Sequence, residues 1–64
     1  MNISNQIFKI RKKANLSQDK FAKIFNVTKQ SVSNWETGKN LPDIQIIVQI
    51  SNYFGITLDE LLKG

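Results

Sequence analysis

A chain of 64 residues, 41% hydrophobic and 22% charged, has the composition of one small globular domain, which excludes a disordered or fibrous protein. It contains no cysteine, which excludes a disulfide framework and a thiolate metal site, so helix packing must stabilise it. The net charge of +4 is divided into +6 over residues 1–40 and −2 over residues 41–64, which indicates either attraction to a polyanion or a solvated lysine-rich surface.

Helix start and stop signals divide the chain into about five short segments, and strand signals are weak. The first predicted helix begins at about Asn2 or Ser4 and ends at Ala14. Its apolar residues recur at three- and four-residue spacing and form one stripe, made by Ile3, Ile7, Ile10 and Ala14. The other faces carry the basic residues, so we expect this stripe to face the core.

Ser17 is a favourable N-cap for a second helix of about one and a half to two turns, and Asn26 ends that helix. Its inward-facing residues are predicted to be Phe21, Ala22 and Phe25. Thr28 is the next candidate N-cap, with Val27 before it as a hydrophobic staple. The third helix ends at Gly38, the residue best able to take a left-handed conformation after a last turn.

The connection between the second and third helices consists of about three residues around position 27. A connection this short does not let two helices lie antiparallel comfortably, so we expect them to cross steeply. Residues 17–37 are therefore predicted to form a helix-turn-helix.

The fourth helix is predicted to follow the loop at residues 41–43 and to stop at Gly55. Its apolar stripe comprises Ile44, Ile47, Ile50 and Phe54. Thr57 is expected to cap a short fifth helix, whose first turn carries two acidic residues that complement the positive end of the helix dipole. The residues expected to close the core there are Leu58, Leu61 and Leu62.

The third helix has an unusual outward face. At about 100° per residue, Val32 and Trp35 lie on one side of the helix and define its inward direction. The opposite side carries short, uncharged polar residues, namely Gln30, Ser33, Asn34 and Thr37, with Lys29 at its edge. Solvent-exposed helix faces usually carry Glu, Lys and Arg, whereas amide and hydroxyl groups match the donor and acceptor pattern of DNA base edges. A merely polar surface is the alternative interpretation.

Many residues of the chain match one family in a single register: Arg11, Leu16-Ser17-Gln18, Ala22, Val27-Thr28, Val32, Trp35-Glu36, Gly38, Pro42 and Leu61. On these residues, over about positions 7 to 62, the sequence resembles the phage repressor and Cro-type (XRE-like) helix-turn-helix proteins. The resemblance implies an all-α, compact five-helix lambda-repressor-like domain. Two positions depart from the family pattern, Ser51 for the usual Ala and Phe21 for the usual Leu.

The resemblance also implies how the domain would contact double-stranded DNA. The side chains that would reach base edges in the major groove are Lys29, Gln30, Ser33 and Asn34. The residues that would bind phosphates are Gln18, Ser31, Lys39 and Asn40. For Gln18, an ordinary first-turn residue is the alternative interpretation.

Arg11 and Glu36 are interpreted as structural residues. The helical wheel places Glu36 towards the inward side of the third helix, where an unpaired acid would be costly. The resemblance implies a partly buried ion pair between Arg11 and Glu36 that holds the first helix against the third. Trp35 is likewise interpreted as a core residue rather than a platform for base stacking.

These interpretations together predict a sequence-specific DNA-binding transcriptional regulator, expected to be a repressor. One such helix contacts only a few base pairs, so a homodimer on a palindromic operator is expected. Three residues off the main stripes, Ile46, Val48 and Leu62, would either form a dimer surface or enlarge the core. An antitoxin-like protein-interaction module is the alternative function.

Catalysis, cofactors and membrane insertion are not expected. The chain has no histidine or cysteine and its few acids are scattered, so no acid-base or metal site can be assembled. No apolar run approaches the roughly 20 residues that span a bilayer, and the N-terminus lacks the apolar segment of a signal peptide. We therefore expect residues 1–64 to form one soluble, cytoplasmic domain without a cofactor.

Overall fold

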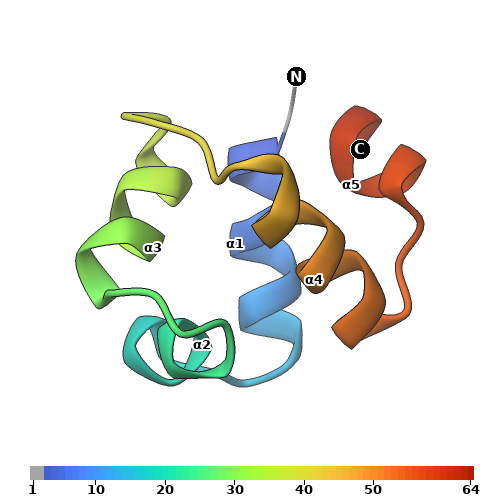
Figure 1. Ribbon diagram of the computed structural model, residues 1–64. Helices are drawn as coiled ribbons and strands as arrows, with labels where there is room; N and C mark the ends of the chain where they lie inside the picture. The colour runs from blue at the N-terminus through green and yellow to red at the C-terminus, as the bar shows by residue number, and fades with distance from the viewer. Residues whose placement is uncertain (1–2) are drawn as a thin grey trace.

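The computed structural model describes residues 3–64 and consists of helices and their connections over that range (Figure 1). The helices are α1 (Ile3–Lys13), α2 (Gln18–Ile24), α3 (Lys29–Thr37), α4 (Ile44–Phe54) and α5 (Leu58–Lys63). The predicted all-α, five-helix fold is confirmed. The alternative start of the first helix at Asn2 lies outside the described residues.

Helix α1 lies in the middle of the molecule (Figure 1). It packs against α3 on one side and against α5 on the other, while α2 contacts α3 and α4 contacts α5. The described residues occupy about 25 × 23 × 21 Å. Each of the five helices contributes buried residues to one shared core. Within residues 3–64, no helix is both long enough and apolar enough to cross a bilayer.

Short-range capping signals set the helix ends. Each predicted N-cap hydroxyl accepts a backbone N–H three residues ahead: Ser17 from Lys20 at 3.1 Å, Thr28 from Ser31 at 3.0 Å and Thr57 from Glu60 at 3.1 Å. Gly38 and Gly55 follow α3 and α4 with φ of 77° and 65°, the left-handed conformation that glycine adopts without strain. The predicted caps are therefore confirmed.

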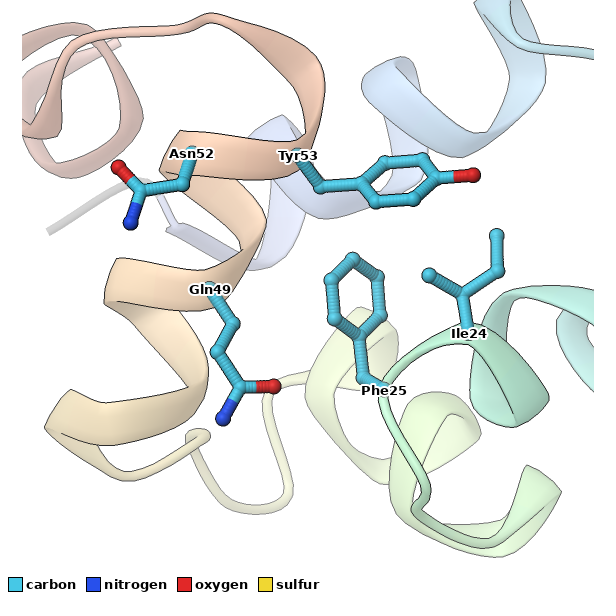
Figure 2. Close-up of a pocket in the computed structure, with 5 residues that line it drawn as sticks. All are labelled: Ile24, Phe25, Gln49, Asn52 and Tyr53. Carbon is cyan, nitrogen blue, oxygen red and sulfur yellow. The ribbon is translucent and has the colours of Figure 1, made fainter.

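The core combines one stripe from each helix. Its fully buried residues of largest volume are Phe21, Ile3, Ile7, Ile50, Leu61 and Val32. Aromatic rings extend this core to the surface: Phe25, which follows α2, contacts Phe54 and Tyr53 of α4, with ring centroids 6.2 and 5.6 Å apart. Figure 2 shows Tyr53 above Phe25, beside Ile24, at the rim of an open hollow between the ends of α2 and α4.

Three predicted core positions are wrong, and each lies at a helix end. Ala14 is exposed because α1 ends at Lys13 and the chain turns away through Asn15, whose φ is 62°. Ile44 and Leu58 are 63% and 40% exposed, because each is the first residue of its helix and no other helix covers it at that level along the helix axis.

The residues off the main stripes divide between core and surface. Ile46 and Leu62 are partly buried and pack against the core, whereas Val48 is 37% exposed. Ser51, which departs from the family pattern, is 9% exposed, and its hydroxyl donates to the Ile56 carbonyl. This hydrogen bond explains how a polar residue is accommodated where an apolar one is usual, since a buried hydroxyl without a partner would destabilise the fold.

Candidate nucleic-acid interface

The α2–α3 unit is built by hydrogen bonds within its turn. The turn consists of residues 25–28, and in Figure 1 α2 lies across the lower end of α3. Asn26 has a φ of 56°, which reverses the chain, and the Val27 N–H then bonds back to the Ala22 carbonyl at 3.0 Å. The Val27 side chain packs against the core, so both helices are fixed relative to the body of the protein.

Helix α3 presents to solvent the face that its sequence indicates. Val32 is completely buried and Trp35 is 5% exposed, and α3 packs against α1. On the other side, Lys29, Gln30 and Thr37 are exposed. Ser33 and Asn34 are only half-buried, so their side chains remain accessible beside these three. The accessible surface of α3 therefore consists of amides, hydroxyls and one lysine.

Two amides on this face are hydrogen bonded to each other. Gln30 Nε2 donates to Asn34 Oδ1 at 3.0 Å, one helical turn apart. The main chain at Asn34 is also held firmly, because its carbonyl accepts from the backbone N–H of Lys39 at 2.9 Å and from the Thr37 hydroxyl at 3.3 Å. Without a ligand, the Gln30 and Asn34 amides of the outward face are thus hydrogen bonded to each other.

A polar network joins α1, α2 and α3 beneath this face. Arg11 donates to both carboxylate oxygens of Glu36, from Nε at 2.6 Å and from Nη2 at 3.0 Å, and its Nη1 donates to the Leu16 carbonyl at 2.8 Å. The Arg11 and Glu36 side chains are only 10% and 5% exposed. This bidentate geometry, with each charge further hydrogen bonded, is the arrangement in which a buried ion pair is tolerated.

Gln18 is a member of the same network, which the sequence did not indicate. Its Nε2 donates to Glu36 Oε1 at 3.1 Å, so the first residue of α2 is tied to α3. One N–H of the Gln18 amide is used in this bond, and the other N–H remains available to donate to a phosphate oxygen. No spacing rule connects positions 18 and 36, so only the packing of α2 against α3 reveals the contact.

The other residues predicted to bind phosphate lie at the two ends of α3. Ser31 is half-buried, and its hydroxyl lies 3.0 Å from that of Thr28. Lys39 and Asn40 are exposed in the segment after the Gly38 cap, and both of their backbone N–H groups bond to the Asn34 carbonyl. All eight predicted DNA contacts thus lie on the start of α2, on α3 or on the segment that follows α3.

The open hollow of Figure 2 is a separate feature. Its lining residues are Ile24, Phe25, Gln49, Asn52 and Tyr53, none of which belongs to α3. Within residues 3–64 there is also no cluster of three or more residues of the types that bind metal ions. The candidate interface is the accessible side of α3 together with the start of α2 and the segment after α3.

The fold and this surface define a helix-turn-helix domain, and comparison with known proteins gives the same result. Residues 7–61 match the helix-turn-helix family model. The chain therefore belongs to the helix-turn-helix family, of the phage repressor and Cro (XRE-like) type that its sequence resembles. A crystal structure of a transcriptional regulator from Listeria innocua superposes with a TM-score of 0.88 at 25% identity, covering 92% of this chain and 55% of that one.

Similar sequences come from two further bacteria. The HTH-type transcriptional activator BcrR of Enterococcus faecalis is 34% identical over 64 residues, which is all of this chain and 31% of BcrR. The prophage-derived HTH-type transcriptional regulator YonR of Bacillus subtilis is 36% identical over 56 residues, or 88% of this chain and 52% of YonR. The B. subtilis HTH-type transcriptional regulator YqaE is 34% identical over 61 residues, 95% of this chain and 53% of YqaE. The chain thus spans about a third to a half of the length of these relatives.

Proposed function

We propose that residues 1–64 form one DNA-binding domain of a transcriptional regulator, whose α3 enters the major groove of double-stranded DNA. The observation that carries this proposal is the accessible surface of α3, which is polar and almost uncharged opposite the buried Trp35. Such a surface fits the hydrogen-bonding edges of bases and is unlike an ordinary solvated helix face. The names of the relatives support the same function. As a bacterial regulator, the protein would act in the cytoplasm.

The proposed contacts divide by position. Base edges are read by the residues on the accessible side of α3, namely Lys29, Gln30, Ser33 and Asn34. Phosphates are bound at the start of α2 and at both ends of α3, by Gln18, Ser31, Lys39 and Asn40. Because Gln18 is bonded to Glu36, its phosphate contact would also set the position of α3 relative to the DNA backbone.

We propose further that the protein acts as a homodimer, at least on DNA, and represses transcription. A single α3 of nine residues reads only a few base pairs, and two copies would read half-sites about 34 Å apart on one face of the duplex. A dimer bound to an operator that overlaps a promoter would repress transcription by blocking access of the polymerase. An inverted repeat in DNA selected by the protein, together with a reporter gene silenced by its expression, would support both proposals.

DNA binding is expected to weaken steeply with salt. Each phosphate contact made by a lysine releases condensed counterions, so the logarithm of the binding constant falls linearly with the logarithm of the salt concentration. Fluorescence anisotropy with a labelled random duplex measures this slope.

Lys39→Ala should reduce the slope by about one unit. Lys63→Ala, on α5, removes an equal charge remote from α3 and should change it little. Absence of binding to the duplex even at low salt would instead favour a protein-interaction module.

Gln30→Ala is expected to change the DNA sequence that the protein prefers without affecting its folding. The side chain is exposed, and its hydrogen bond is to Asn34 on the same accessible face, so its removal leaves the core intact. Selection of bound sequences from a random pool measures the preference, and thermal unfolding followed by circular dichroism measures the stability. The same consensus for both proteins would contradict the assignment of Gln30 to a base edge.

A further inference from the structure

The hydrogen bond between Gln30 and Asn34 limits what Gln30 can offer to a base. A free glutamine amide has two N–H donors and a carbonyl acceptor. In this protein one N–H of Gln30 is directed to Asn34 Oδ1 at 3.0 Å. The other N–H and the carbonyl of Gln30 are left for a ligand. The Gln30 amide therefore offers one donor beside one acceptor.

The position of Asn34 supports this restriction. Its carbonyl accepts the backbone N–H groups of Gly38, Lys39 and Asn40, so its main chain belongs to the C-cap of α3. The side chain is half-buried, whereas that of Gln30 is exposed. We therefore take Asn34 as the anchored partner, whose side-chain oxygen orients the exposed Gln30 amide.

The purine bases differ in the pattern that they present to such a group. In the major groove, adenine offers the N6 donor beside the N7 acceptor, whereas guanine offers two acceptors, O6 and N7. A free glutamine can bind adenine with its carbonyl and one N–H, or guanine with its two N–H groups. Once one N–H is occupied, the guanine arrangement is lost and the carbonyl would face a second acceptor.

We infer that the Gln30–Asn34 pair makes Gln30 a reader of adenine, and that Asn34 is the positioning residue that excludes guanine at that base pair. This inference rests on the proposed insertion of α3 into the major groove. Asn34 thereby has a role besides any contact of its own with DNA. By orienting the Gln30 amide, it sets which base Gln30 prefers.

The test is selection of bound duplexes from a random pool with four forms of the 64-residue protein: the parent, Gln30→Ala, Asn34→Ala and Asn34→Asp. The position read by Gln30 is the one whose preference disappears in Gln30→Ala. We expect adenine there in the parent protein. Asn34→Ala should lower the ratio of adenine to guanine by at least about fivefold, the lower end of the discrimination that a bidentate contact provides.

Asn34→Asp is the matched control for orientation. Its carboxylate keeps an acceptor for the Gln30 N–H, so the ratio of adenine to guanine should stay close to that of the parent, although the added negative charge lowers affinity for every sequence. As an independent measurement, replacing the selected adenine with 7-deazaadenine should weaken binding of the parent and leave Gln30→Ala unchanged.

The outcomes separate this inference from the function on which it rests. Guanine at the Gln30 position, or an unchanged ratio in Asn34→Ala, would overturn the inference while DNA binding stands. If the parent protein enriches no sequence and its binding to duplex DNA does not depend on salt, the proposed function fails and the inference fails with it.

Discussion

Trp35→Ala is expected to destabilise the protein by about 3 to 5 kcal/mol, because removal of a buried indole leaves a cavity that the surrounding helices fill only in part. Trp35 is 5% exposed and belongs to the same buried cluster as Ile7 and Ile10 of α1. A chain of this size has a free energy of unfolding of about 3 to 10 kcal/mol, so the substitution removes a large share of it. Most molecules of the variant should be unfolded at physiological temperature if the parent lies near the lower limit.

Thermal unfolding followed by circular dichroism measures this effect. A loss of 3 kcal/mol corresponds to a fall in Tm of at least about 12 °C for a domain of this length. Thr37→Ala is a matched control, since its side chain is exposed on the opposite side of the same helix, and it should shift the Tm by far less. Equal stability of parent and Trp35→Ala would show that α3 faces the core with a different side.

Glu36→Ala is expected to have a comparable effect for an electrostatic reason. It would leave the Arg11 guanidinium, 10% exposed, without the carboxylate that accepts two of its hydrogen bonds. Removal of one partner of a buried ion pair typically costs about 3 to 5 kcal/mol, since the remaining charge is neither hydrated nor paired. The Gln18 amide would lose its partner as well, so the start of α2 should become less well ordered against α3.

A double variant separates the loss of a charge partner from the loss of packing. In Arg11→Met with Glu36→Leu both charges are replaced by apolar side chains of similar length, a change that is often neutral or stabilising. Urea unfolding of the parent, Glu36→Ala and the double variant gives the three free energies. If the double variant is as unstable as Glu36→Ala, the cost does not come from an unpaired charge.

The helix pattern could be predicted because its signals act over short distances. Ser17, Thr28 and Thr57 accept backbone N–H groups only three residues away, and Gly38 and Gly55 reverse the chain locally. The accessible face of α3 follows from the same kind of information, since Val32 and Trp35 define its inward side through helical periodicity alone.

Burial at the helix ends could not be predicted in this way. The apolar spacing that places Ile47 and Ile50 in the core also includes Ile44, which the structure leaves 63% exposed. Periodicity gives the direction in which a side chain points, but not whether another helix covers it at that level. Ala14 and Leu58 are exposed for the same reason.

By itself, therefore, the sequence determined the five helices, their caps and the polar character of the α3 surface, since each depends on residues within one or two helical turns. Only the tertiary structure decided that Gln18 joins Glu36 and that Ser51 satisfies its hydroxyl at the Ile56 carbonyl. These contacts depend on where α2, α3 and the α4–α5 connection come to lie, which is set by the packing of the whole core around α1. The same packing gives the candidate DNA-binding surface its fixed geometry.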